Sequence, residues 1–352
     1  MKKSKKIISL AFVALLLISI VPMSASAAEV VYGNFSFELN GTTNQATLSE
    51  YNGNSSSVKV PDTVYGYTVT KIDDLVFYKH DEIQSVSLPN TIKSIGFSAF
   101  SSCTKLKKII LPVTVTSMGE YTFNNCTSLT EAYVNSAIET LPNYMFKNCT
   151  SLTKVNVNFY TEKIGTRAFD GCTSLKSLPN GVAITEIGDE AFFNSGLESI
   201  KINDTVTTIA NGAFSNCSKL TKVNIPSSVT SISDNAFSNC GENLTIIGDY
   251  GSYAEKYAKD NNITFEENPL LIGDVNNDGA INVRDSVYIL RYIALQSGYE
   301  IPDGSPIFKR ADVNGDGKID VTDATLIQKY ALHMIDKFWL YVNSWGKSTK
   351  MK

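Results

Sequence analysis

The sequence predicts a β-rich solenoid followed by a small all-α module, and three observations support this fold class. A phenylalanine recurs about every 23 residues through the middle of the 352-residue chain, which is typical of a stack of short β-coils. Two twelve-residue loops of one polar pattern begin 38 residues apart near the C-terminus, and a helical period follows each. A basic and then apolar N-terminal segment precedes both units.

The N-terminal segment has the organisation of a secretory signal peptide. Four lysines lie within residues 2–6, an apolar run covers residues 7–23, and small residues follow at 24–28. This order predicts cleavage after Ala27 or Ala28. An uncleaved anchor helix is the weaker alternative, because the apolar run is short and ends in an A-x-A pattern. We therefore assign residues 1–28 to a signal peptide and expect an exported protein with no membrane span after cleavage.

The charge balance of the chain is acidic. It contains 31 Lys and Arg against 35 Asp and Glu, a net charge of −4. Loss of the four leader lysines leaves 27 basic residues, so the net charge of the mature chain is −8 (27 − 35). No basic block and no stripe of lysines and aromatics interrupts this balance, which argues against nucleic acid as a partner.

The middle of the chain repeats with a period of 23 residues. Each repeat has an apolar residue five positions before a phenylalanine and, in most copies, another six positions after it. A two-residue alternation follows, as in Ile109-x-Leu111, and predicts a short strand with one face inward. No repeat can bury its own apolar face, so stacked repeats share one core. About eight 23-residue coils are predicted from Phe77, Phe100, Phe123, Phe146, Phe169, Phe192, Phe214 and Phe237.

The segments beside the repeats predict caps and a linker. Residues 29–61 contain alternating apolar residues typical of strands, and we expect them to form an N-terminal cap. Residues 252–259 have helical spacing and predict a C-terminal cap, so the solenoid with this cap covers 62–266. Residues 267–272 form a short linker that lacks the Pro, Ser and Thr of a flexible tether. The second unit then covers 273–336, and an apolar tail covers 337–352.

The phrase I-G-x-x-A-F-x-x-C-x-x-L, as in residues 95–106, resembles the repeat of the BspA-like branch of the leucine-rich repeat family. The resemblance implies a β-rich leucine-rich-repeat solenoid, whose exposed strand side chains form a concave surface that often binds ligands. Ile110 and Tyr133 fall on neighbouring strands of this surface, as a contact patch or as ordinary strand residues. The other outward positions are mixed: Lys108, Glu131, Lys154, Asn156, Ser199, Lys201, Lys222 and Asn224.

All six cysteines occupy one repeat position, three residues after the phenylalanine, where His80 and Ser195 stand in two other coils. A ladder of parallel core side chains favours buried free thiols, because cysteine packs there as a small hydrophobe. Disulfides between neighbouring coils are the alternative, although parallel Cβ vectors fit the disulfide torsion poorly. Nothing gathers four ligands at zinc spacing. The cysteines are Cys103, Cys126, Cys149, Cys172, Cys217 and Cys240.

The two loops, 274–285 and 312–323, have the donor pattern of a calcium site. Oxygen side chains stand at positions 1, 3, 5, 9 and 12, with Gly at position 6. Calcium takes six to eight oxygen ligands, and the glycine allows the sharp turn around the ion. Position 7 supplies a main-chain carbonyl, and we expect two calcium ions. The predicted ligands are Asp274, Asn276, Asp278, Ala280, Asn282, Asp285, Asp312, Asn314, Asp316, Lys318, Asp320 and Asp323.

Both loops depart from the EF-hand pattern. Position 12 is Asp in place of Glu, and no helical period precedes the first loop. Helices are expected after each loop, over residues 286–295 and 324–332. A duplicated loop and helix of this kind resembles a type I dockerin, and the resemblance covers residues 273–336. It implies binding to the cohesin module of a scaffoldin, and so a secreted protein attached to the cellulosome of an anaerobic bacterium.

Within that resemblance, cohesin choice lies largely at loop positions 10 and 11 and on the following helix. Valine at position 10 of both loops departs from the Ser/Thr pair of the best-known clostridial type, which leaves open which cohesin is bound. A solvated helix face is the alternative interpretation of these positions. The predicted partner-binding residues are Val283, Arg284, Arg291, Tyr292, Val321, Thr322, Lys329 and Tyr330.

No sequence motif indicates catalysis. The only histidines are His80 and His333, and G-x-S-x-G, P-loop and H-E-x-x-H motifs are absent from the sequence. We therefore expect a secreted, non-catalytic cellulosome component of polysaccharide metabolism, whose dockerin anchors a solenoid that binds a protein or a glycan. A polysaccharide-degrading enzyme is one alternative. An adhesin or inhibitor that acts at the cell surface is another.

Overall fold

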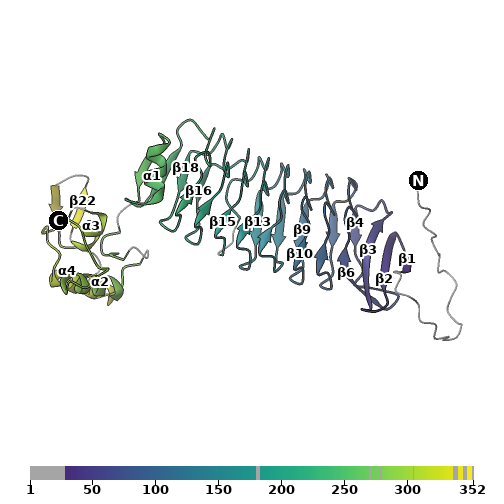
Figure 1. Ribbon diagram of the computed structural model, residues 1–352, viewed down its shortest axis with the longest axis horizontal. Coiled ribbons are helices and arrows are strands. Elements are labelled where there is room, and N and C mark those ends of the chain that lie inside the picture. The colour runs from purple at the N-terminus through teal and green to yellow at the C-terminus, as the bar shows by residue number, and fades with distance from the viewer. Residues whose placement is uncertain are drawn as a thin grey trace. The chain divides into compact units, whose positions relative to one another are not determined.

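The computed structural model describes residues 28–179, 183–268, 271–276, 280–303, 305–335, 340–343 and 347–350. The chain divides into two compact units, residues 1–266 and 267–352. Short coils stack along one axis in the first unit, and helices dominate the second (Figure 1). The predicted fold class is thus confirmed. Residues 1–27 lie outside the described residues, so the signal peptide stays a prediction; within the described part, no helix is long and apolar enough to cross a membrane.

Parallel stacking begins earlier in the chain than the sequence indicated. Strands β1 (Ala28–Tyr32), β2 (Phe35–Asn40) and β3 (Gln45–Tyr51) form an antiparallel meander. Strand β3 then pairs in parallel with β6 (Tyr67–Ile72), which β5 (Thr63–Val64) also joins. The segment assigned to an N-terminal cap therefore already contributes to the stack. With the strands added at both ends, the solenoid has about ten coils rather than eight.

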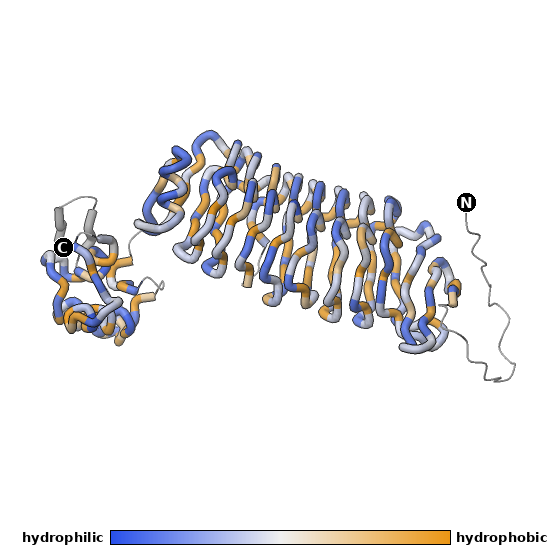
Figure 2. Tube along the Cα trace, in the orientation of Figure 1, coloured by the Kyte–Doolittle hydropathy of each residue, from blue (hydrophilic) through white to orange (hydrophobic). Residues whose placement is uncertain are grey.

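Each typical coil contributes one longer and one shorter strand. The longer strands form two parallel ladders: β4 (Ser57–Lys59), β7 (Ser85–Ser87), β9 (Lys108–Leu111), β11 (Glu131–Val134) and β13 (Lys154–Val157), and then β16 (Ser199–Lys201), β18 (Lys222–Asn224), β20 (Thr245–Gly248) and β21 (Thr264–Glu267). The shorter strands are β8 (Ser94–Ile95), β10 (Ser117–Met118), β12 (Thr140–Leu141), β14 (Lys163–Ile164), β15 (Glu186–Ile187), β17 (Thr208–Ile209) and β19 (Ser231–Ile232). Hydrophobic and hydrophilic segments alternate within the coils (Figure 2).

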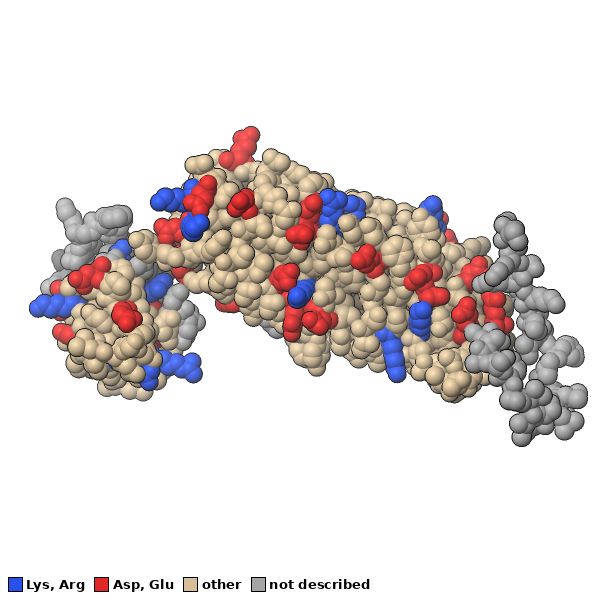
Figure 3. Space-filling view, viewed as in Figure 1, with Lys and Arg blue, Asp and Glu red and all other residues tan. Residues whose placement is uncertain are grey.

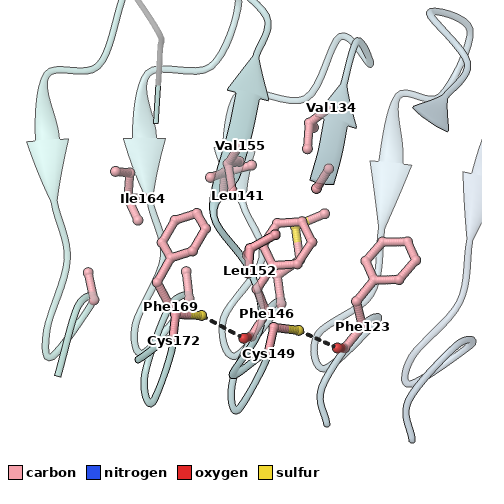
Figure 4. Close-up of a cluster of buried hydrophobic side chains, with 14 of the residues drawn as sticks. Phe123, Val134, Leu141, Phe146, Cys149, Leu152, Val155, Ile164, Phe169 and Cys172 are labelled. Carbon is pink, nitrogen blue, oxygen red and sulfur yellow. Dashed lines mark hydrogen bonds between the residues drawn. The ribbon is translucent and has the colours of Figure 1, made fainter. Parts of the chain in front are cut away.

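Stacked phenylalanines form the centre of the solenoid. From Phe77 to Phe237, rings of successive coils lie 4.8–5.6 Å apart at their centroids and within 4–17° of parallel. Seven of these eight rings have no exposed surface. Each cysteine thiol donates to the carbonyl of the phenylalanine of the preceding coil, as Cys149 does to Phe123 at 3.1 Å (Figure 4). The thiols are free, which confirms the interpretation of the cysteine ladder.

The bend around each phenylalanine from Phe77 to Phe214 contains two residues with a left-handed backbone. They stand two positions before and two after the ring, as Tyr121 and Asn125 do around Phe123, both with φ of 58°. Asparagine tolerates this conformation better than most residues, and it takes the second position in five coils. The recurring asparagine is therefore a signature of the bend.

Helix α1 (Tyr253–Asp260) closes the C-terminal end of the solenoid. Its first turn is capped by Ser252, whose side chain accepts from the Glu255 amide. Tyr257 packs edge-on against Phe237 at 5.9 Å, and its hydroxyl donates to the carbonyl of Asp234 at 3.0 Å. Burial raises the pKa of Tyr257 to about 12. The helix thus covers the last ring of the phenylalanine stack.

The second unit contains helices α2 (Val283–Ile293), α3 (Pro306–Ala311) and α4 (Val321–Ala331). A small core joins them, in which Val275 and Val313 follow the first residue of each loop, and Ile289 and Ile327 face inward from α2 and α4. The unit is not wholly helical, because strands β22 (Leu340–Asn343) and β23 (Lys347–Lys350) form an antiparallel hairpin in the segment assigned to the tail.

Candidate calcium loops and docking surface

The second polar loop is closed by its first residue. The carboxylate of Asp312 accepts hydrogen bonds from the amides of Asp316, at 3.1 Å, and Gly317, at 3.0 Å. Gly317 has a φ of +82°, which few other residues adopt, so glycine at loop position 6 allows the turn. The main chain of the loop therefore turns around the carboxylate of Asp312.

The residue at loop position 12 ties both ends of this loop together. Asp323 is fully buried. One of its carboxylate oxygens accepts from the main-chain amides of Val313 and Asn314. The other accepts from the main-chain amide of Asp320 at 3.0 Å. Burial raises the pKa of Asp323, and the backbone hydrogen bonds only partly offset this effect. The same carboxylate also forms the capping box at the start of α4.

The remaining side chains of the second loop form short local hydrogen bonds. Asn314 accepts from the amide of Asp316 at 2.8 Å, and Asp316 accepts from the amide of Lys318 at 2.9 Å. Asp320 accepts from the amide of Thr322 at 2.7 Å and is the N-cap of α4. Hydrogen bonds from the Thr322 side chain and backbone lower the pKa of Asp320. Loop position 9, which is a predicted ligand, is therefore also the N-cap of α4.

The first loop repeats this arrangement. Asp285 is fully buried and accepts from the amides of Asn276 at 3.1 Å and Asn282 at 2.9 Å. The Asn282 side-chain oxygen accepts from the main-chain amide of Arg284 and so caps α2, while the Asn282 side-chain NH2 group donates to the carbonyl of Ala280. Asp274 is also buried. Asp278, the predicted ligand at position 5, lies outside the described residues.

The donor set of both loops fits calcium. Carboxylate, amide and main-chain oxygens are hard ligands of the kind calcium prefers, and no thiol or imidazole stands among the predicted ligands. In the parts of the loops that the structure describes, three or more acidic, histidine or cysteine side chains do not converge on one point. The calcium ligands therefore stay predictions, with Asn276, Asn282 and Asn314 supplying amide oxygens and Ala280 and Lys318 main-chain carbonyls.

Three of the predicted partner-binding residues meet around a hollow beside α2. Val283, Arg284 and Arg291 line a space of about 500 Å³. Val287 lies one turn after Val283 on the same exposed side, and Asn276, Tyr288, Gly298 and Tyr299 form the rest of the wall. Arg291 donates to the hydroxyl of Tyr299 and lies over its ring. We call this set of residues the α2 docking surface.

The sequence missed part of this surface, and two of the predicted partner-binding tyrosines, one on α2 and one on α4, are only partly exposed. Val287 follows Val283 by four residues, so helical spacing contained that signal, whereas Tyr299 lies in an interhelical loop without a period. Tyr292 and Tyr330 are only half-exposed, and Tyr292 packs against the core of the unit. On α4, Val321, Thr322 and Lys329 are exposed as predicted.

Comparison with known protein families identifies both units. A model described as "BspA type Leucine rich repeat region (6 copies)" matches residues 70–179 and 155–263, which together are more than half of the chain. The chain belongs to the BspA-type leucine-rich repeat family. A "Dockerin type I domain" model matches residues 272–332, so a type I dockerin domain follows the repeats. No curated protein matches the chain.

Solved structures of leucine-rich repeat proteins are similar to the repeat region. A protein from T. pallidum is 22% identical, with 68% of this chain and 98% of that chain covered and a TM-score of 0.43. A protein from Bacteroides ovatus is 21% identical, with 62% and 70% covered and a TM-score of 0.46. One from Eubacterium ventriosum is 23% identical, with 60% and 52% covered and a TM-score of 0.44.

In this leucine-rich repeat solenoid, the strand register places Ile110 beside Tyr133, as the repeat spacing indicated. The ammonium groups of Lys108 and Lys154 lie over the Tyr133 ring at 4.6 Å and 5.4 Å, and the tyrosine hydroxyl donates to Glu131. The ring is thus already engaged by its neighbours. Ile110, about half exposed, supplies the apolar part of this patch.

Charged side chains of both signs are interspersed over the leucine-rich repeats. On the face shown in Figure 3, Lys and Arg lie among Asp and Glu without a region of one sign. Several form ion pairs between neighbouring coils, such as Lys147 with Asp170 at 2.7 Å and Lys163 with Glu186 at 3.2 Å. These ion pairs connect adjacent repeats. Within one coil, His80 forms a hydrogen bond with Glu82 at 2.7 Å beside the first phenylalanine ring.

Proposed function

We propose that this protein is a secreted, non-catalytic component of a cellulosome. Its dockerin binds the cohesin module of a scaffoldin in the presence of calcium, and its leucine-rich repeat solenoid binds a protein or a glycan. The observation that carries the proposal is the union of a type I dockerin and BspA-type repeats on one chain. Neither family is catalytic, and dockerin-bearing proteins are typically extracellular. The predicted signal peptide at residues 1–28 supports export.

Calcium has a defined role in this proposal. Two ions, held by the twelve predicted ligands, would supply the positive charge that allows buried Asp285 and Asp323 to lie beside other acidic groups. In each loop, position 9 is the N-cap of the helix that carries the docking residues. Order in the loop therefore fixes the start of the helix. Residues 283–284 and 321–322 follow at once, so the ion acts on the docking surface through the main chain.

The α2 docking surface offers the chemistry that a protein partner needs. Val283 and Val287 expose 52% and 40% of their surface, while Arg284 and Arg291 border them. Exposed apolar side chains beside arginines are typical of the centre of protein interfaces. We therefore infer that a cohesin packs on Val283 and Val287 and pairs acidic or carbonyl groups with the two arginines.

Cohesin binding by the full chain, without residues 1–28, tests this function. In excess calcium we expect at least one type I cohesin of a panel to bind, and excess EDTA to abolish the binding. Asp316→Ala removes a predicted ligand, whereas Asp303→Ala, an exposed acidic residue outside the loops, is the matched control. Tight binding that persists in EDTA, or a panel in which no cohesin binds, would reject the proposal.

A further inference from the structure

A groove crosses the long-strand face of the solenoid where its ladder is interrupted. The groove has a volume of about 810 Å³, and Val113 is the first and Asn203 the last of its lining residues in the chain. These lining residues come from five successive coils, so the groove runs across the strands rather than along one of them. It lies between β13, the last strand of the first ladder, and β16, the first of the second. We call it the strand-gap groove.

Proline explains the interruption. Residues 176–179 fill the place of a strand in the coil between β13 and β16, and Pro179 stands 23 residues after Asn156 of β13. Because proline has no N–H, it cannot donate to a ladder. In the described part of the chain, no backbone hydrogen bond joins residues 176–179 to a neighbouring coil. Val157 and Leu178 are half-exposed as a result, and they give the groove an apolar floor.

The polar lining of the groove is neutral except for one lysine. Asn135 and Asn158 are equivalent residues of successive coils, and the Asn158 side-chain amide donates to the Asn135 carbonyl at 2.8 Å. The Asn158 side-chain oxygen is buried and has no hydrogen-bond partner in the described structure. Ser177, Ser199 and Lys201 add exposed hydrogen-bonding groups, and no Asp or Glu occurs among the described lining residues.

Aromatic rings with accessible surface lie at the edge of the groove. Phe159 lines it and exposes 61% of its surface, and the adjacent Tyr160 exposes 55%. The two rings contact each other, with centroids 4.2 Å apart and planes tilted by 38°. Because both rings keep more than half of their surface exposed, the pair offers an aromatic surface to a ligand at the edge of the groove.

This combination fits a polyhydroxylated ligand better than a peptide strand. An aromatic face and an apolar floor suit the C–H faces of a sugar ring, and amides and hydroxyls suit its O–H groups. The coils repeat every ~4.8 Å, so equivalent groups recur at a regular spacing along an extended ligand that crosses the coils. An added peptide strand would need the space between β13 and β16, which residues 176–179 already occupy.

We propose that the strand-gap groove is a binding site for a linear neutral glycan. Phe159 stacks on one sugar ring, and the exposed side chains of Asn135, Ser177 and Ser199 hydrogen-bond to hydroxyl groups of neighbouring units. This inference rests on the proposed function, because it assigns the solenoid's ligand to the glycan class and gives it a location. It is independent of calcium, since the groove lies wholly within the leucine-rich repeats.

Calorimetric titration of the full chain with neutral hexasaccharides of glucose, xylose or mannose units tests the proposal. We expect at least one of them to bind equally well in calcium and in EDTA, and Phe159→Ala to weaken its binding at least tenfold. Ser199→Trp should block the groove, whereas Ser85→Trp is the matched control, because Ser85 is an exposed serine at the same repeat position on β7. Thermal unfolding verifies that each variant is folded.

Three outcomes would overturn the glycan site. In the first, no neutral hexasaccharide binds. In the second, a hexasaccharide binds but Phe159→Ala leaves its affinity unchanged. In the third, acidic oligosaccharides or extended peptides bind more tightly than the neutral hexasaccharides, and this binding depends on Phe159. Cohesin binding measured on the same preparation separates this failure from failure of the proposed function. If cohesin binds and no glycan does, only the glycan assignment is wrong.

Discussion

At the scale of single residues, the cysteine ladder shows how a repeat position determines chemistry. Each thiol donates to a carbonyl one coil away, at 3.1–3.2 Å. Burial is the main cause that raises the pKa of these thiols, for Cys103 and Cys240 to about 12. Ser195 takes the same position in one coil and lies 3.2 Å from the Cys217 sulfur. A small donor therefore satisfies the position, and thiol reactivity is not required.

The raised thiol pKa values predict lower stability at alkaline pH. Unfolded thiols ionise near pH 8.5, while the buried thiols of the folded chain stay protonated until higher pH. The stabilisation is therefore complete below about pH 8.5 and is lost as the pH rises toward 12, by about 1.4 kcal/mol per pH unit for each thiol that ionises only on unfolding. Urea unfolding at a series of pH values measures this slope. Cys149→Ser, which introduces the hydroxyl that Ser195 already places in the ladder, should reduce it.

Thiol counting checks the same ladder independently. The native chain should react slowly with a thiol reagent at pH 8, and the denatured, unreduced chain should show six thiols. Fewer than six thiols after denaturation would indicate disulfides and contradict the free ladder. An unchanged alkaline slope in Cys149→Ser would show that other groups, such as the buried Tyr257, determine the pH dependence.

At the scale of the elements, a single coil depends on its phenylalanine. Phe146 is fully buried and stacks on Phe123 and Phe169 at 5.6 Å and 5.5 Å. Phe146→Ala should lower the free energy of unfolding by about 3–5 kcal/mol, because it leaves a cavity between two coils. Phe97→Ala is the control, since Phe97 is 44% exposed. Chemical denaturation that showed equal losses for the two variants would contradict the stacked core.

The two dockerin helices should not contribute equally to cohesin binding. Val283 and Val287 give α2 two exposed apolar side chains, whereas Thr325 takes the position of Val287 on α4. The double variant Val283→Asp/Val287→Asp should therefore weaken binding more than Val321→Asp/Thr325→Asp, by tenfold or more. Titration with one cohesin measures both. The reverse order of affinities would show that α4 carries the main contact.

The sequence predicted the elements better than their ends and contacts. Helices were expected from residues 286 and 324, but α2 and α4 begin at Val283 and Val321, because Asn282 and Asp320 act as caps as well as predicted ligands. The apolar period starts later than the capping box, so periodicity alone misplaces the helix start. The strand-gap groove was not foreseen either. The loss of strand alternation before Pro179 is visible in the sequence. Which residues of the neighbouring coils lie beside it follows only from the register of the coils.

At the scale of the whole molecule, two different kinds of order occur on one chain. The solenoid has a continuous apolar core from Val30 to Ala258. The dockerin has a far smaller apolar core, and its two loops are rich in carboxylates. A small core contributes little stability by itself, so the metal ions should matter much more for this unit.

Calcium should therefore stabilise only one of two unfolding transitions. Each calcium ion at 100 times its dissociation constant adds about 2.7 kcal/mol to the stability of the folded dockerin. EDTA should lower the transition of residues 267–352 and leave that of the solenoid unchanged. Calorimetry of the full chain, with hydrogen exchange to assign each transition, measures both. Asp316→Ala should reproduce only part of the effect of EDTA in calcium, because it removes a ligand of the second loop alone, and Phe146→Ala should shift only the other transition. A single transition that moved as a whole with calcium would show that the two units unfold together.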